Sequence, residues 1–176
     1  LEAKAAVLAA VESTTLPVFA TMTFGEDSRT FLGTTPAIAA TTLSALGASA
    51  VGLNCSLGPT ELAPFVGELA PYDRALVMAQ PNAGLPRIQD GETVFDVGPN
   101  EFAQAMEAIL DAGATVVGGC CGTTEEHIAA LKATLKDAEY VRPAPECLDL
   151  LPAATEKEAF FLPADACLLY TSDAAD

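Results

Sequence analysis

Three cysteines in this sequence have the residue type and the setting of metal ligands. Cys120 and Cys121 are adjacent in a glycine-rich loop that follows a short apolar segment, and Cys55 ends a second short apolar segment. Thiolates are good zinc ligands, and a catalytic zinc site keeps three protein ligands and one open position. We therefore predict that these three cysteines hold one zinc ion that activates a thiol substrate.

The alternative is that the cysteines are small core residues, because free cysteine is among the most buried residue types. Packing explains an isolated cysteine better than it explains a Cys-Cys pair between glycines. Cys147 and Cys167 lack such a setting and are interpreted as incidental. His127 lies at the start of the following helix, and we interpret it as a surface or capping residue rather than a ligand.

Strands and helices alternate along the chain and must position these cysteines. We expect apolar strands at 17–24, 50–54, 75–79 and 114–117, a short extra strand at 93–95, and helices at 1–13, 35–46, 59–70, 100–112 and 124–138. This alternation predicts an α/β fold with parallel strands. The notable loops all follow the carboxyl ends of strands, which favours a partial TIM (β/α)8 barrel of about four βα units. A doubly wound sheet would alternate similarly, but no glycine-rich dinucleotide loop follows the first strand.

Local signals around the Cys-Cys pair indicate a tight turn that leads into a helix. Gly118, Gly119 and Gly122 permit the turn that would let both thiols reach one ion. Thr123 and Glu126 have the spacing of a capping box. The amino end of the helix that follows should favour thiolate over thiol in the loop.

Composition excludes several classes of function. The 176 residues suffice for one domain with a sizeable core, and 24 acidic against 8 basic residues give a net charge of −16. This charge argues against binding to nucleic acid or to an anionic membrane. No apolar run reaches the roughly 18 residues of a membrane span, and the first residues lack the cationic start of a signal peptide. Five cysteines in such a chain fit reduced thiols or a metal site, so we expect a cytoplasmic protein.

The chain divides into three parts. Residues 1–140 carry the regular alternation, and 141–167 read as a linker or the start of a next region, in which Phe160–Leu162 is a candidate strand. Residues 168–176 are interpreted as a tail that is not native to the protein.

Five segments of the first part resemble one known family. They include the Cys-Cys loop with the start of its helix, the segment around Cys55, and the loops that follow the first and third strands. The segments are 22–24, 29–34, 52–59, 81–86 and 117–128. Together they are similar to the homocysteine S-methyltransferases, and most closely to the homocysteine-binding barrels of the cobalamin-dependent methionine synthases. The resemblance covers essentially residues 1–140, with all motifs in order.

The resemblance implies a (β/α)8 barrel in which Cys55, Cys120 and Cys121 bind Zn²⁺. It also implies that Asn82 binds the amino-acid portion of homocysteine. The methyl donor would be methylcobalamin, carried on another domain and recharged by a methyltetrahydrofolate domain beyond this chain. The match begins after the family's fourth strand, so the first half of the barrel, with an acidic substrate-binding residue, is expected to be missing.

Two other interpretations stay open. The chain could belong to a betaine- or S-methylmethionine-dependent homocysteine methyltransferase, or it could be an inactive zinc-binding fragment. Half a barrel leaves open sheet edges and an exposed apolar face, so we expect the isolated chain to fold poorly or to associate. Glu26, Asp27 and Arg29 in the first loop could contact substrate or could equally be solvated loop charges.

Overall fold

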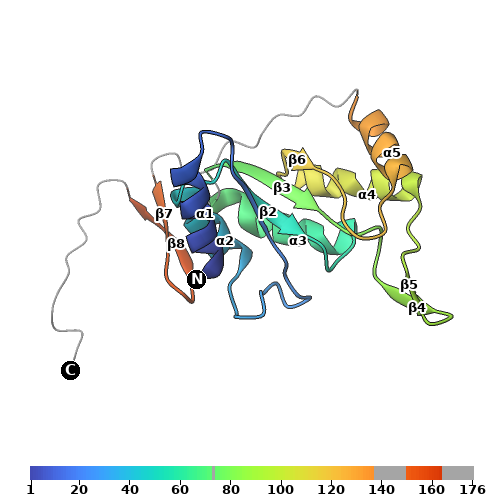
Figure 1. Ribbon diagram of the computed structural model, residues 1–176, viewed down its shortest axis with the longest axis horizontal. Coiled ribbons are helices and arrows are strands. Elements are labelled where there is room, and N and C mark those ends of the chain that lie inside the picture. The colour runs from blue at the N-terminus through green and yellow to red at the C-terminus, as the bar shows by residue number, and fades with distance from the viewer. Residues whose placement is uncertain (73, 137–149, 164–176) are drawn as a thin grey trace.

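A computed structural model describes residues 1–72, 74–136 and 150–163 of the chain (Figure 1). The helices are α1 (Glu2–Ser13), α2 (Pro36–Ala45), α3 (Pro59–Leu69), the 3₁₀ turn η1 (Ala70–Tyr72), α4 (Pro99–Asp111) and α5 (Glu125–Leu135). The strands are β1 (Phe19–Met22), β2 (Ala50–Asn54), β3 (Leu76–Gln80), β4 (Arg87–Gln89), β5 (Glu92–Val94), β6 (Val116–Val117), β7 (Leu150–Ala154) and β8 (Ala159–Pro163).

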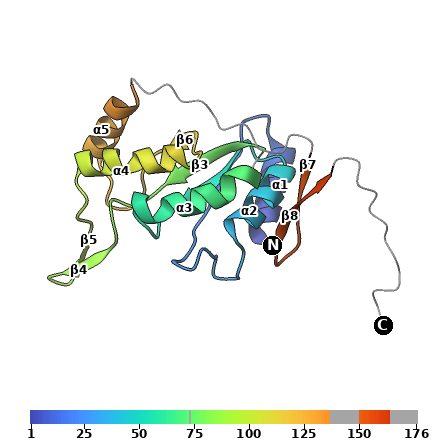
Figure 2. The ribbon, with the colours of Figure 1, turned by 180° about the vertical axis from the view of Figure 1, so that it is seen from behind.

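Four parallel strands form the central sheet in the order β1-β2-β3-β6. Each strand is joined to the next by a segment that contains a helix, as right-handed βα crossovers require. Helices α3 and α4 lie behind the sheet in Figure 1 and in front of it in Figure 2, so they cover one face. The expected α/β class, with four parallel βα units of a partial barrel, is confirmed.

Alternation along the strands divides the sheet into a buried face and an open face. Val51 and Leu53 of β2 and Val77 of β3 join the hydrophobic core that the helices also supply. On the opposite face Phe19 is 50% exposed and Leu76 is 40% exposed. The face that half a barrel should leave uncovered therefore exposes Phe19 and Leu76, whereas Ala50, which pairs with both of them, is buried.

The main differences from the predicted elements lie at the ends of the sheet. Strand β6 pairs only at Val116 and Val117, because it has a single neighbour, β3, in the described sheet. The short extra strand predicted at 93–95 is one arm of a hairpin, β4–β5. Asp90 and Gly91 turn this hairpin with positive φ angles of 53° and 85°, as a two-residue turn with left-handed geometry requires.

The strand predicted at Phe160–Leu162 is confirmed as part of β8, which pairs with β7 in a second hairpin. Its apolar residues do not alternate, so periodicity did not indicate the whole hairpin. Stacking of Phe161 on Tyr72, with ring centroids 4.5 Å apart, attaches the hairpin to the helical side. The boundary at 140/141, Cys147, Cys167 and the suspected tail at 168–176 lie outside the described residues.

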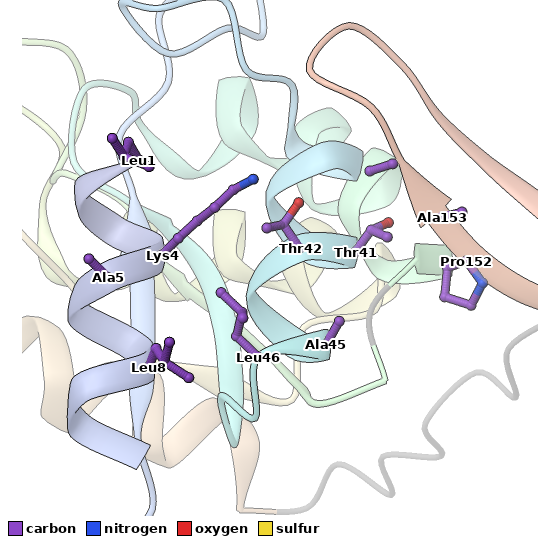
Figure 3. Close-up of a pocket in the computed structure, with 11 residues that line it drawn as sticks. Leu1, Lys4, Ala5, Leu8, Thr41, Thr42, Ala45, Leu46, Pro152 and Ala153 are labelled. Atoms are coloured by element: carbon purple, nitrogen blue, oxygen red, sulfur yellow. The ribbon is translucent and has the colours of Figure 1, made fainter. Parts of the chain in front are cut away.

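A groove of about 480 Å³ lies between α1, α2 and β7 (Figure 3). Its walls are mostly apolar, with Lys4 and Thr42 among the polar contributors. The buried hydroxyl of Thr41 also lines it and has no hydrogen-bond partner among the described residues. No cysteine contributes to this groove, so it is separate from the thiols described below. In the described ranges, no helix combines the length and the hydrophobicity that crossing a membrane would need.

Candidate metal centre

Cys55 is held at the end of β2 by an unusual backbone. Its N–H donates to the carbonyl of Gln80 at 2.9 Å, which continues the pairing of β2 with β3 beyond the strand. Cys55 and Ser56 then have φ angles of 63° and 65°. The N–H of Leu57 donates to the carbonyl of Cys55 at 2.7 Å and closes a three-residue turn. Two successive non-glycine residues with positive φ are strained, and nothing in the local sequence predicted them.

The loop of Cys120 and Cys121 is fixed by the segment that follows β3. The N–H of Cys120 donates to the carbonyl of Pro81 at 2.8 Å, and the carbonyl of Cys121 accepts from the N–H of Ala83 at 2.9 Å. The N–H of Cys121 donates to Oδ1 of Asn82 at 3.1 Å. The backbone on both sides of each thiol is therefore anchored to β3 and its continuation.

Of the three glycines predicted to form the turn, Gly122 alone has a positive φ, 76°. A Cβ at this position would also lie 2.4 Å from the Phe95 side chain. Gly119 is required for another reason, since its Cβ would meet the Thr123 side chain at 2.4 Å. Gly118 has no such restriction, because a Cβ there would lie 3.6 Å from its nearest neighbouring atom.

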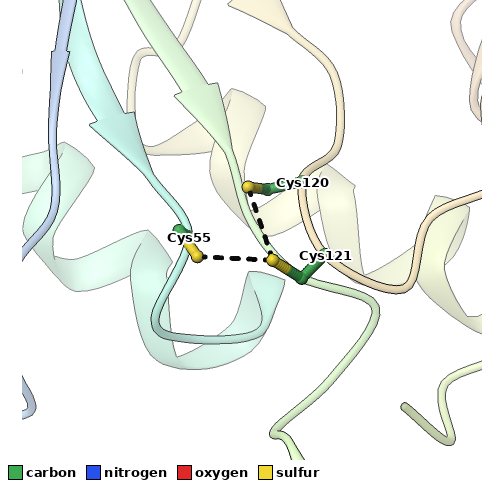
Figure 4. A group of neighbouring side chains, drawn as sticks. All are labelled: Cys55, Cys120 and Cys121. Carbon is green, nitrogen blue, oxygen red and sulfur yellow. Dashed lines mark hydrogen bonds between the residues drawn. The ribbon is translucent and has the colours of Figure 1, made fainter. Parts of the chain in front are cut away.

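The three thiols converge at the carboxyl edge of the sheet (Figure 4). Sγ of Cys121 lies 3.6 Å from Sγ of Cys55 and 3.9 Å from Sγ of Cys120, and all three sulfurs lie within 4.8 Å of one another. Ideal tetrahedral coordination with zinc–sulfur distances of about 2.3 Å separates the sulfurs by about 3.8 Å. The predicted residues are thus brought together at a spacing that fits one zinc ion.

Without a metal, the crowded thiols differ in acidity. Burial raises the pKa of Cys55. The Ser56 backbone and the side chains of Cys121, Cys120 and Asn82 lower it by more than burial raises it, so the pKa of Cys55 lies below its ordinary value. Hydrogen bonds to Cys55 and Cys120, with a smaller effect of burial, raise the pKa of Cys121 to about 11.

The expectation that the helix after the loop favours thiolate in the Cys-Cys pair is therefore wrong for Cys121. Its proton is held by the neighbouring sulfurs in the metal-free arrangement. The backbone N–H of Thr124, the residue before the helix, is also engaged elsewhere, because it donates to Nδ1 of His127.

Asn82 is 2% exposed and lies between two of the thiols. Its Oδ1 accepts from the Cys121 N–H, and its side chain contributes to the lowered pKa of the Cys55 thiol. Its own N–H donates to the carbonyl of Leu57 at 2.9 Å. The residue for which the family resemblance implies substrate binding is thus part of the hydrogen-bonded framework of the cysteine cluster.

His127 caps its helix but is not a surface residue, since it is only 7% exposed. Thr124 is the N-cap and His127 is the third helical residue of the capping box, whereas the sequence pattern predicts Thr123 and Glu126. The hydroxyl of Thr123 instead donates to the carbonyl of Cys120 at 2.7 Å. The sequence does contain the observed capping box, Thr124 followed three residues later by His127, but the usual form of the motif has Glu or Gln at the third helical position.

Two charged residues of the first loop make contacts within that loop. Arg29 donates from Nη1 to the carbonyl of Gly33 at 2.9 Å, and Oδ1 of Asp27 accepts from the N–H of Arg29 at 3.2 Å. Asp27 and Arg29 therefore help to fix the conformation of this loop.

Comparison with known proteins agrees with the geometry of the cluster. Residues 1–135 match the family model described as homocysteine S-methyltransferase. Methionine synthase of Mycobacterium tuberculosis (strain ATCC 25618 / H37Rv) is 37% identical over 148 residues, which cover 79% of this chain. Methionine synthase of Mycobacterium leprae (strain TN) is 35% identical over 141 residues, or 77% of this chain. The chain spans only 12% of the length of each of these relatives.

Proposed function

Because the chain belongs to the homocysteine S-methyltransferase family, we propose that it forms the thiol-activating part of an enzyme that methylates homocysteine to methionine. The observation that carries this proposal is the convergence of three cysteine thiols from β2 and the loop after β6. Such a donor set favours zinc over the oxygen-preferring divalent metals.

Cys55, Cys120 and Cys121 would hold the zinc ion. When bound, zinc supplies a Lewis acid that shifts a substrate thiol toward its nucleophilic thiolate form. A free thiol is mostly protonated at neutral pH, because its ordinary pKa is about 8.5. The substrate sulfur would then attack the methyl group of the donor while the bond from that methyl group to the donor breaks.

The residues around the thiols would orient the ligands and the substrate. Asn82 fixes the backbone of Cys121 through Oδ1, and we assign it the further task of binding the amino-acid portion of homocysteine. The loop containing Cys120 is anchored to Pro81, so the relative positions of two ligands and the substrate-binding residue depend on one short segment.

We further propose methylcobalamin as the methyl donor, carried on a cobalamin domain and recharged by a methyltetrahydrofolate domain beyond this chain. The similarity to two methionine synthases supports this choice. A cytoplasmic location is part of the same proposal, since a reducing compartment keeps the three thiols available to a metal.

The test is a methyl-transfer assay on the gene product at its natural length. Methionine formation is measured from homocysteine with methylcobalamin, betaine or S-methylmethionine as donor. The proposal expects methylcobalamin to be used and the Cys120→Ser variant to be inactive. Methionine formation with betaine or S-methylmethionine, and none with methylcobalamin, would show that the proposed donor is wrong. A zinc-loaded protein that is inactive with all three donors would favour the interpretation as an inactive zinc-binding fragment.

A further inference from the structure

His127 is a buried titratable residue that the proposed reaction does not use. Its side chain is only 7% exposed, and its ring packs edge-on against Phe102 with centroids 5.6 Å apart and an interplanar angle of 82°. Both ring nitrogens have partners. Nδ1 accepts from the Thr124 N–H at 3.2 Å, so Nε2 carries the hydrogen and donates to the carbonyl of Val97 at 2.9 Å.

These two bonds complete a closed ring of hydrogen bonds around the Cys-Cys loop. The carbonyl of Cys121 accepts from the N–H of Ala83, and the carbonyl of Ala83 accepts from the N–H of Val97 at 3.2 Å. The carbonyl of Val97 accepts from His127, which in turn accepts from Thr124, three residues after Cys121. Within the described residues, His127 is the side chain that closes this ring, because it bonds to the backbone of both Val97 and Thr124.

The ring joins the loop to the segment that covers it. Phe95 lies two residues before Val97 and packs directly over Gly122, where a Cβ would approach its side chain to 2.4 Å. Gly84, next to Ala83, packs against Val97 at a similarly close distance of 2.6 Å for a Cβ. Loss of the His127–Val97 bond would release this covering segment from α5, and with it the restraint on the backbone of Cys121.

We propose that His127 is a positioning residue for the metal centre, which acts through Val97 and Thr124 to hold the Cys120–Cys121 backbone in its metal-binding conformation. This role rests on the function proposed above. Outer residues that orient metal ligands typically change metal affinity about 10–100-fold when they are mutated. Since His127 acts through the backbone rather than on a ligand atom, we expect an effect near the lower value.

The test uses the gene product at its natural length and measures Co²⁺ and Zn²⁺ affinity, with the thiolate-to-cobalt absorption band as a report on geometry. The His127→Phe variant keeps an aromatic ring against Phe102 but has neither hydrogen bond. We expect about tenfold weaker metal binding and an altered cobalt band. The matched control is Leu131→Ala, one turn further along α5 and 3% exposed, which removes core packing without touching the ring.

Two amide variants test the bonds to Thr124 and to Val97 separately. They also replace His127→Phe as the test if that variant does not fold. His127→Gln has the length to accept from Thr124 and to donate to Val97, whereas His127→Asn is shorter and reaches only Thr124. We expect His127→Gln to retain most of the metal affinity and His127→Asn to lose it. Hydrogen exchange of the amides of Ala83, Val97 and Cys121 in the metal-free protein should accelerate in His127→Asn and not in His127→Gln.

Three results would overturn the proposal. Equal metal affinity and an equal cobalt band in wild type, His127→Asn and His127→Gln would show that His127 does not position the ligands. A loss in His127→Phe that is matched by Leu131→Ala would show that general stability alone is responsible. Failure of the wild type to bind either metal would overturn both this inference and the proposed function, whereas the first two results leave the function standing.

Discussion

The backbone N–H of Cys121 donates to Oδ1 of Asn82 at 3.1 Å, so a thiol from the loop after β6 and an amide that follows β3 are fixed relative to each other. Asn82 is almost completely buried, and its side chain also contributes to the lowered pKa of the Cys55 thiol. The amide therefore contacts cysteines from both sides of β3, and under the proposed function a change to it should affect both metal binding and substrate binding.

The Asn82→Ala variant should lose stability and substrate affinity together. It leaves the Cys121 N–H without its acceptor, and an unsatisfied buried group costs about 1–3 kcal/mol. Thermal unfolding measures the first effect, and the KM for homocysteine measures the second. Asn82→Asp is the matched variant, because it keeps an acceptor for Cys121 but replaces the amide group that lowers the pKa of Cys55. Unchanged KM in both variants would remove Asn82 from the substrate site.

Zinc content should depend on each of the three clustered cysteines. We expect about one zinc ion per chain in the wild type and a large loss in Cys55→Ser, Cys120→Ser and Cys121→Ser, because each removes one of three thiolate ligands. Elemental analysis by mass spectrometry measures the ratio. Cys147→Ser is the control and should retain the metal. Zinc that persists in all three ligand variants would return the cysteines to a structural role.

Gly122→Ala and Gly67→Ala should change stability in opposite directions. An alanine at 122 must adopt a φ of 76° and its Cβ meets Phe95, so we expect destabilisation by more than about 1 kcal/mol. Gly67 lies within α3 with open space around its Cβ position. Alanine there should stabilise the helix by about 0.5–1 kcal/mol. Denaturant unfolding compares the two, and equal effects would contradict the strained turn at Gly122.

Alkylation of the metal-free thiols should follow their acidities. At about pH 8, Cys55 should react before Cys121, because the thiolate is the reactive form and the pKa of Cys55 is lowered while that of Cys121 is raised to about 11. Mass spectrometry of iodoacetamide-treated peptides gives the order. Bound zinc should protect both residues. Faster labelling of Cys121 would mean that its greater exposure outweighs its acidity.

The raised pKa of Cys121 also predicts how the stability of the metal-free protein depends on pH. The folded state keeps the Cys121 proton up to about pH 11, whereas the unfolded state releases it near the ordinary value of 9.0. The folded state therefore binds more protons between these values, and stability should fall as the pH rises through this window. Thermal unfolding of wild type and Cys121→Ser over this range measures the effect, which should be smaller in the variant.

The open face of the sheet should cause the 176-residue chain to associate. Phe19 of β1 and Leu76 of β3 are exposed there, on the two strands that flank β2. Light scattering of the isolated chain should show association that is reduced in the Phe19→Ser/Leu76→Ser double variant. Phe31→Ser is the control, because Phe31 is fully exposed in a loop rather than on the sheet. A monomeric wild-type chain with cooperative melting would contradict this prediction.

The sequence by itself determined the alternation of elements, the parallel sheet and the identity of the three clustered cysteines. These features depend on local signals, such as Pro36, Pro59 and Pro99 at helix starts and the two cysteines between glycines, and the periodicity of a strand or helix is visible within a few residues. A short continuous apolar run indicated the strand at 160–162, whereas its hairpin partner β7, which contains Pro152, was not predicted.

Only the tertiary structure decided how the cysteines are held. The positive φ angles of Cys55 and Ser56, the amide of Asn82 between two thiols, and the burial of His127 all depend on segments far apart in the chain. The His127–Val97 bond spans 30 positions and the Cys55–Cys121 contact spans 66. Local propensity contains no information about such partners, because the register of β2, β3 and β6 in the folded sheet brings them together.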